Sequence, residues 1–298
     1  MLVRFPIARR RGRRNGEGGR WAVGRLEGKV AFITGGARGQ GRSHAVLMAE
    51  EGANIITLDL CRQVPSVEYP MATPEDLEET VRLVEKTGQR IVAREADVRD
   101  FAAVEGVLAE GLAEFGRVDF VLANAGIMPI TGALGREHSA FYDAIDVMLT
   151  GVFHTCEAAI PTMIEQDQGG AIVITSSTAG LKGFASSRRM AASGGLGYIA
   201  AKHGVVGLMR AYANSLAAHR IRCNTVHPTG VNSPMVVNEA FSRFVEENPE
   251  SAGALTNPLP IELLDVSDIS RAIIFLCSSE GQYITGVTLP VDAGICNK

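Results

Sequence analysis

Short apolar runs recur along the chain and alternate with segments whose apolar residues follow a helical spacing. One such segment runs through Ala45, Leu47, Met48 and Ala49, directly after an apolar run. Strands of a parallel sheet are buried on both faces and are therefore apolar throughout, while the helices between them cover the sheet. The pattern predicts one α/β domain. The runs expected to form strands are Lys29–Ile33, Asn54–Leu58, Arg90–Arg94, Phe120–Ala123, Ala171–Thr175 and, as a seventh strand, Val287–Val291.

The length and composition of the chain agree with one large domain. It has 298 residues, of which 46% are hydrophobic, enough to bury a sizeable core. A membrane-spanning helix needs about 18 apolar residues, and no apolar run of this chain approaches that length, so we expect a protein that does not enter a membrane. The odd number and wide spacing of the cysteines favour a reducing compartment, and we expect the cytoplasm. We expect neither a disulfide framework nor a metal site, because the cysteines are odd in number and widely spaced: Cys61, Cys156, Cys223, Cys277 and Cys296.

The first 25 residues differ in kind from the rest. They carry eight arginines and one glutamate, a net charge of +7, which leaves about −11 on the remaining chain. We expect residues 1–25 to be a solvated basic arm, or to result from a start codon placed too early, and residues 26–298 to form the domain. The acidic body argues against nucleic-acid binding by the folded part.

A glycine-rich turn follows the first predicted strand and precedes a helix. It reads Thr34-Gly35-Gly36-Ala37-Arg38-Gly39-Gln40-Gly41. Glycines let a backbone approach a pyrophosphate closely, and the amide groups of the new helix direct positive charge at it. A glycine turn alone is weak evidence for a nucleotide, but the strand–turn–helix order strengthens it.

The second predicted strand ends on Asp59, 18 residues after Gly41. A carboxylate at this place accepts the ribose hydroxyls of NAD, and its charge repels the 2′-phosphate of NADP. Arg38 argues the other way, because a guanidinium there can meet that phosphate. We favour NAD, since Arg38 can turn to solvent or pair with Asp59.

A segment without clear periodicity, Cys61–Pro74, lies between Asp59 and the third predicted strand and contains three prolines. It is longer than most such connections, and such loops are often functional. Its position after Asp59 predicts that it folds over the cofactor and slows its release. Thr73 or Pro74 should begin the next helix, whose first residues are acidic, as a helix N-terminus prefers.

Polar motifs follow the later predicted strands. Asp97-Val98, Asn124-Ala125-Gly126 and Ser176-Ser177 come after the third, fourth and fifth strand. Ligands of open parallel sheets bind beyond the carboxyl ends of the strands, so these motifs should gather at one crevice.

Tyr198 and Lys202 are expected to lie one turn apart on a helix that opens near Tyr198 and runs to about Leu216. An ammonium beside a phenol favours the phenolate, so Tyr198 should exchange protons with an alcohol more readily than a free tyrosine does. A tyrosine and a lysine at this spacing, without other motifs, more often lie on the surface of an amphipathic helix. The other motifs make the chemical interpretation the better one.

These motifs in sequence, with His227-Pro228-Thr229-Gly230, resemble the short-chain dehydrogenase/reductase family over residues 26 to 294. The resemblance implies a three-layer Rossmann fold with a doubly wound, mainly parallel seven-stranded sheet, NAD as cofactor and no metal. The residues that it implies in NAD binding are Gly35, Arg38, Gly39, Gln40, Gly41, Asp59, Leu60, Asp97, Val98, Asn124, Ala125, Gly126, Tyr198, Lys202, Pro228, Gly230 and Val231.

The proline-rich insert after Asp59, with Gly39–His44 and Lys202–Arg210, is similar to the mycofactocin-coupled, carveol dehydrogenase-like subfamily. This likeness implies that NAD is held without exchange and passes its hydride to the peptide-derived carrier mycofactocin. The resemblance to the short-chain dehydrogenase/reductase family as a whole implies a homotetramer built through helices that include the one bearing Tyr198.

The resemblance further implies three catalytic residues. Tyr198 would be the acid and base, Lys202 would lower its pKa and hold the nicotinamide ribose, and Ser177 would bond the substrate oxygen. A serine hydroxyl both donates and accepts, so it can follow an oxygen that changes from alcohol to carbonyl. Ser176 is the rival for this position.

Two departures from the family pattern stand out. Met148 occupies the position of an asparagine that holds a water for proton transfer, so either another group substitutes or turnover slows by about 10 to 100-fold. Ser177 and Tyr198 are 21 residues apart where the family has about 13. The extra residues, within 186–195, either reshape the pocket or bulge into solvent.

Residues from about 231 to 260 should form the substrate lid. Its apolar residues Met235, Val236, Val237, Phe241 and Phe244 suit a hydrophobic secondary alcohol or ketone, although for any one of them alone a plain surface helix is the better explanation. Two alternatives remain open: a ketone reductase with freely exchanging NAD(P)H, and a nucleotide-binding protein that has lost catalysis.

Overall fold

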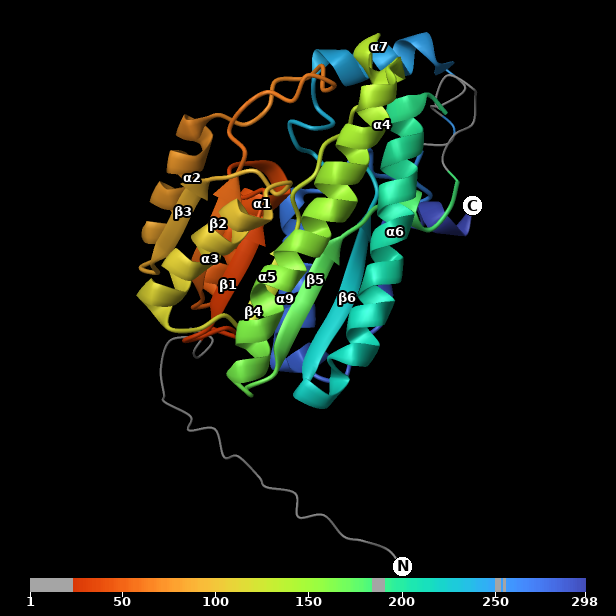
Figure 1. Ribbon diagram of the computed structural model, residues 1–298. Helices are drawn as coiled ribbons and strands as arrows, with labels where there is room; N and C mark the ends of the chain where they lie inside the picture. The colour runs from red at the N-terminus through yellow and green to blue at the C-terminus, as the bar shows by residue number, and fades with distance from the viewer. Residues whose placement is uncertain (1–23, 184–190, 250–252, 254–255) are drawn as a thin grey trace, which may run out of the picture.

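The computed structural model describes residues 24–183, 191–249, 253 and 256–298. Seven parallel strands form one sheet in the order β3-β2-β1-β4-β5-β6-β7 (Figure 1). This confirms the doubly wound Rossmann architecture. The strands are β1 Val30–Thr34, β2 Asn54–Asp59, β3 Ile91–Glu95, β4 Phe120–Ala123, β5 Gly170–Thr175, β6 Ile221–Pro228 and β7 Thr288–Val291.

Helices cover both faces of the sheet. Helices α3, α5 and α6 bury one cluster of apolar residues, and α1 and α9 bury the other on the opposite face (Figure 1). The helices are α1 Gly39–Glu50, α2 Pro74–Glu85, α3 Phe101–Phe115, α4 His138–Ile145, α5 Gly151–Glu165, α6 Ser193–Ser215, α7 Glu239–Glu247 and α9 Val266–Cys277, with short turns η1 Leu134–Arg136, η2 Asp146–Thr150, η3 Thr178–Gly180, η4 Ala217–His219, η5 Ser279–Gly281 and η6 Ile295–Asn297.

The strand order reverses between β1 and β4, which pair with each other. The chain leaves β1 toward β2 on one side of the sheet and leaves β4 toward β5 on the other. The turns after these two strands therefore diverge and open a crevice at the carboxyl edge. The polar motifs that follow the strands all lie at this edge.

Helix α6 begins at Ser193, so the prediction that Tyr198 opens it was wrong. Gly194 and Gly197 lie within this helix, where the absence of a side chain lets the neighbouring backbone pack closely against it. A Cβ on Gly194 would lie 1.7 Å from the carbonyl oxygen of Pro129, and one on Gly197 2.7 Å from that of Phe141. Of the predicted insert 186–195, residues 186–190 lie outside the described part, and residues 193–195 form the first turn of α6.

The helix α2 begins at Pro74 with Thr73 as its cap, as predicted. The side chains of Thr73 and Asp76 each accept a hydrogen bond from the other's backbone amide. The cysteines are all free, and four of the five are buried. Of the basic arm, residues 1–23 lie outside the described part.

One continuous helical stretch, His138–Glu165, is long and apolar enough to cross a membrane by composition alone. The sequence pattern did not indicate it. Some of its apolar side chains, among them Cys156, Ala159 and Met163, are buried in the core beside α3 and the sheet. A helix that is buried in a protein core can have the same length and apolar composition as a membrane-spanning helix.

Candidate active site

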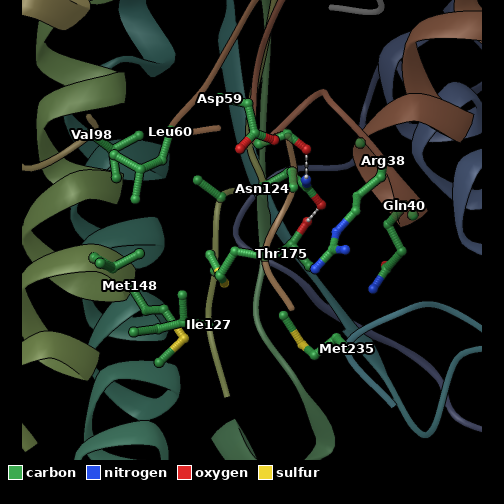
Figure 2. A pocket seen from close by; sticks show the side chains of 18 of the residues that line it. Arg38, Gln40, Asp59, Leu60, Val98, Asn124, Ile127, Met148, Thr175 and Met235 are labelled. Atoms are coloured by element: carbon green, nitrogen blue, oxygen red, sulfur yellow. Dashed lines mark hydrogen bonds between the residues drawn. The ribbon is translucent and has the colours of Figure 1, made fainter. Parts of the chain in front are cut away.

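The glycine turn, Asp59, Leu60, Asp97, Val98 and the Asn124–Gly126 turn all line one cleft at the carboxyl edge of the sheet (Figure 2). Tyr198 and Lys202 line the same cleft from α6. Most of the predicted cofactor residues are therefore brought together. Pro228, Gly230 and Val231 line a second cavity, which Tyr198 also lines.

The glycines of the turn are required by close packing. Gly35 has φ +74°, and a Cβ on it would lie 2.8 Å from Cα of Ala125. A Cβ on Gly41 would lie 1.9 Å from the carbonyl oxygen of Gly35. The turn thus folds tightly against the start of α1, whose first amide groups face the cleft. Gly39, with φ +55°, supplies the remaining left-handed residue.

Asp59 is held at the end of β2 by backbone donors. Its Oδ2 accepts from the amide of Ala37 at 2.9 Å, and burial raises the pKa of Asp59 against the effect of these hydrogen bonds. Arg38 takes neither of the two positions considered from the sequence. Its guanidinium donates to the carbonyl oxygen of Pro70 in the Cys61–Thr73 loop. Arg38 therefore ties the glycine turn to that loop.

Asn124 joins the ends of three strands. Its Nδ2 donates to the carbonyl oxygens of Thr34 (3.1 Å) and Gly35 (3.3 Å), and its Oδ1 accepts from the hydroxyl of Thr175 at 3.2 Å (Figure 2). The hydroxyl of Thr34 in turn accepts from the backbone amide of Asn124. This network fixes the floor of the cleft between β1, β4 and β5.

The Cys61–Thr73 loop covers the cleft, and Val64, Tyr69, Met71 and Ala72 line it. Gln63 shapes the loop from inside: its Nε2 donates to the carbonyl oxygen of Val67 at 2.6 Å and its Oε1 accepts from the amide of Met71. The hydroxyl of Tyr69 accepts from the amide of Met128, beyond β4. The loop is therefore attached to both sides of the crevice.

Asp97 lies at the edge of the cleft, after β3. Burial opposes its ionisation, but hydrogen bonds from Arg99, the shortest at 2.7 Å, outweigh burial and keep the pKa of Asp97 low. Asp97 is thus a charged acceptor that is already engaged on one side. Val98 beside it is buried and apolar.

Ser176 and Ser177 are distinguished by what they bond. The hydroxyl of Ser176 is buried and donates to the backbone oxygen of Lys202 at 2.8 Å. Ser177 is half-buried, faces the second cavity and accepts from the amide of Ala179. The geometry favours Ser177 as the residue that meets a substrate.

The electrostatics of Tyr198 and Lys202 correct the prediction that lysine lowers the tyrosine pKa. Burial raises the pKa of Tyr198, and only a hydrogen bond with Ser177 opposes this. Burial also lowers the pKa of Lys202 to about 8. The Nζ of Lys202 donates to the backbone oxygen of Thr175 at 2.8 Å and lies 5.7 Å from the centre of the Tyr198 ring. In the chain alone, the bonded Lys202 ammonium therefore does not lower the pKa of Tyr198 below its ordinary value.

Met148 is buried in the π-helical turn η2 and lines the cleft. Its sulfur packs against Gly126, where a Cβ would lie 3.6 Å away. A thioether is a weak acceptor and offers no donor. The apolar packing gives Met148 a structural role, and the effect on turnover stays a prediction.

The second cavity has a volume of ≈ 700 Å³. Met235, Val236, Phe241 and Phe244 line it, as predicted for the lid, whereas Val237 is 55% exposed and does not. The lid segment starts where Val231 pairs with Leu264 and contains α7. The residues 250–252, 254 and 255 lie outside the described part.

Sequence reasoning missed several residues that line the cleft. Tyr69 and Thr175 belong to segments that were noted, but no motif marks them individually. Gln40 was assigned to the cofactor, yet it lies between the two cavities and lines both. Its Oε1 is buried and has no hydrogen-bond partner among the described residues.

A parallel sheet with a glycine turn and a Ser-Tyr-Lys group at its carboxyl edge defines a Rossmann-type oxidoreductase. The model of a family described as Enoyl-(Acyl carrier protein) reductase matches residues 35–296. The chain belongs to this family, a branch of the short-chain dehydrogenases/reductases.

Individual relatives agree with this membership. An uncharacterized oxidoreductase of Mycobacterium tuberculosis is 56% identical over 92% of this chain and 98% of that protein. The (-)-trans-carveol dehydrogenase of Rhodococcus erythropolis is 44% identical over 91% of this chain and 99% of that protein. The crystal structure of carveol dehydrogenase from Mycobacterium avium in complex with NAD has a TM-score of 0.85 at 44% identity, and covers 93% of this chain and 100% of that one.

Proposed function

We propose that the protein interconverts a hydrophobic secondary alcohol and its ketone with NAD as cofactor. One observation carries the proposal: Tyr198 lines both the cleft with the glycine turn and the apolar cavity that contains Ser177. A proton-exchanging group between a nucleotide site and an apolar site is what alcohol oxidation requires. The NAD and carveol dehydrogenase named for the relatives support the same reaction.

The residues of the cleft fit a dinucleotide. Amide groups at the start of α1 suit a pyrophosphate, Asp59 suits a ribose diol, and the buried Oε1 of Gln40 lacks a donor that a ligand can supply. When bound, oxidised NAD supplies the hydride acceptor and a positive charge beside Tyr198. We propose NAD over NADP because Asp59 repels a 2′-phosphate and Arg38 is engaged with the loop.

Three side chains would carry out the proton chemistry. Tyr198 would accept the proton of the substrate hydroxyl as its phenolate, which the positive charges of Lys202 and of bound oxidised NAD would favour, and Ser177 would donate to the oxygen as it becomes a carbonyl. Lys202, anchored by the carbonyl of Thr175, orients the ribose and keeps a positive charge behind Tyr198. The buried environment excludes water that would otherwise compete for these hydrogen bonds.

We further propose that NAD does not exchange during turnover and that a mycofactocin-type carrier reoxidises it. The Cys61–Thr73 loop supports this, since it closes the cleft through contacts of Arg38, Gln63 and Tyr69. A loop that is bonded to both sides of the cleft has to release some of these contacts before a cofactor can enter or leave.

Assembly and compartment complete the proposal. Apolar side chains are exposed on α4, α5 and α6, with Tyr142 63%, Phe153 43% and Leu196 42% exposed. Such side chains support a homotetramer that buries these helices. Five free thiols are consistent with a reducing cytoplasm.

The deciding experiment isolates the protein, identifies any bound nucleotide by mass, and measures reduction of that nucleotide by carveol in a single turnover. We expect NAD that external NAD does not displace, and its reduction by alcohol. Free exchange would favour the ordinary reductase. Bound NAD that no alcohol reduces would favour the impaired nucleotide-binding protein and overturn the proposed activity.

A further inference from the structure

The apolar cavity is much larger than a single terpene ring requires. Its volume is ≈ 700 Å³. At about 20 Å³ per packed non-hydrogen atom, a terpene alcohol of about eleven such atoms fills roughly 220 Å³. Even after the nicotinamide takes its share beside Pro228 and Val231, space for about twenty or more substrate atoms remains.

Polar side chains line the cavity at two places. Ser177 and Tyr198 lie beside the cleft, and Thr256, Asn257 and the exposed Glu262 lie on the segment that also carries Leu259 and Ile261. Farther along the wall, the amide of Asn257 is already used: its Nδ2 donates to the carbonyl oxygens of Ile261 and Glu262, and its Oδ1 accepts from Thr229. Most of the remaining wall offers hydrocarbon contact, so the body of the substrate should be apolar.

The walls continue outward over side chains that water still reaches. Leu259 is 60% exposed and Ile261 is 43% exposed, and both line the cavity. On the lid side, Phe241 and Phe244 stack with their ring centres 6.3 Å apart and form a broad apolar surface. A substrate that reaches from Tyr198 to these residues gains burial of apolar area that a small alcohol leaves wet.

We infer that the substrate is an apolar secondary alcohol or ketone of about twenty non-hydrogen atoms, bulkier than a monocyclic terpene. This inference rests on the proposed function, because it assigns the substrate class of the same site. The reacting carbon lies at Tyr198 and Ser177, and the remaining carbons extend along the lid toward Leu259 and Ile261.

The test compares alcohols of two sizes and two shapes by the second-order rate constant for reducing bound NAD. Carveol and decan-2-ol form the small pair; androstanol and nonadecan-2-ol form the large pair, one member a fused-ring and the other a chain alcohol. We expect at least one large alcohol to react about tenfold or more faster than its small counterpart. The large alcohol that reacts faster then shows whether the cavity prefers a fused-ring or a chain substrate.

Two tryptophan variants check that the cavity volume causes the preference. Val245 lines the cavity from α7, and Val245→Trp should lower the large-to-small ratio by about tenfold or more. Val237 lies outside the cavity, so Val237→Trp is the matched control and should leave every rate unchanged.

The outcomes separate the two proposals. Small alcohols that react as fast as large ones, or a Val245→Trp variant that slows both sizes equally, would overturn the inference and leave the proposed function standing. Protein with bound NAD that none of the four alcohols reduces would overturn the proposed function itself.

Discussion

The two cavities that meet at Tyr198 are built in different ways. The cleft is formed by strand ends and tight turns, whose positions are fixed by backbone hydrogen bonds such as those of Asn124. The apolar cavity is formed by the first turns of α6 on one side and, on the other, by α7 and irregular segments that pack through side chains. Backbone geometry demands particular residue types, whereas apolar packing accepts many. Cofactor chemistry is therefore specified by short motifs, and substrate choice is not.

The largest expected effect is at the residue that the cavities share. Tyr198→Phe removes the hydroxyl that exchanges the proton, and we expect alcohol oxidation to fall by about 10²- to 10⁴-fold. The bound nucleotide should remain, because the phenyl ring still fills the wall. Single-turnover rates with the nucleotide content measured on the same sample check this. Undiminished oxidation would refute the role given to Tyr198.

Asp59→Ser tests the cleft alone. It removes the carboxylate that opposes a 2′-phosphate, and we expect the preference for NAD over NADP to fall by about 10- to 100-fold. The preference among alcohols should not change, since Asp59 does not line the apolar cavity. Refolding with each nucleotide and mass analysis of what is bound measures the shift. An unchanged nucleotide preference would show that Asp59 does not select the cofactor.

The same contrast explains how far the sequence predicted the structure. The six predicted strands lie within one residue of those observed. The inner strands β1, β2, β4 and β5 are apolar runs that are largely buried, whereas β3 and β7 lie at the two edges of the sheet and are half-buried or exposed. The residues that gather at the cleft were predicted because parallel strands end at one edge. The start of α6 was missed because Gly194 and Gly197 indicate a loop by propensity, while their contacts across the helix interface are long-range.

Long-range effects also explain the remaining differences. The pKa of Tyr198 depends on burial that spacing along the helix does not reveal. The hydrogen bond of Arg38 to Pro70 depends on how the loop folds back over the turn. The volume of the apolar cavity depends on where α7 packs, and no local pattern specifies that.

Lys202 offers a pH test of burial beside the cleft. Burial lowers its pKa from 10.5 to about 8, so between these values the unfolded chain binds more protons than the folded one. The free energy of unfolding contributed by this group therefore rises with pH across that window.

Lys202→Met removes this pH-dependent contribution. It also removes the hydrogen bond to Thr175, so the test uses the change of stability with pH and not the stability at one pH. The stability of the parent protein minus that of the variant should increase from about pH 8 toward 10.5. The raised pKa of Tyr198 makes the free energy of unfolding fall as the pH rises above the ordinary tyrosine pKa. This effect is present in the parent and in the variant and therefore cancels in the difference. Urea unfolding of both proteins at matched pH measures the difference, and a flat profile would contradict the buried charge.

Gln63→Ala tests whether the loop, and not the cleft, controls cofactor exchange. It removes the side chain that bonds the backbone of Val67 and Met71, so we expect bound NAD to exchange about tenfold faster. Gln282→Ala, an exposed glutamine beyond η5, is the matched control. Labelled NAD followed by mass gives the exchange rate. Equal rates in both variants would show that the loop is not the barrier.

The smallest expected effect is at His227, which is fully buried near the end of β6 and contacts the backbone of Ser177. Its Nδ1 lies 2.7 Å from the backbone oxygen of Ser177, and its Nε2 lies 2.7 Å from the hydroxyl of Thr225. A carbonyl only accepts, so Nδ1 must carry the proton and Nε2 must accept from Thr225. Burial lowers the pKa of His227 to about 4, so the ring stays neutral near pH 7.

His227→Leu leaves the carbonyl of Ser177 without this donor, and we expect the rate of alcohol oxidation to fall by about 3- to 10-fold. His227→Asn keeps a donor at the same place and should retain most of the rate. The nucleotide content should not change in either variant, because His227 does not line the cleft. Equal losses in both variants would mean that packing of the imidazole ring, and not its hydrogen bond, positions Ser177. The wall of the apolar cavity at Ser177 would then be held by side-chain packing, as the lid is.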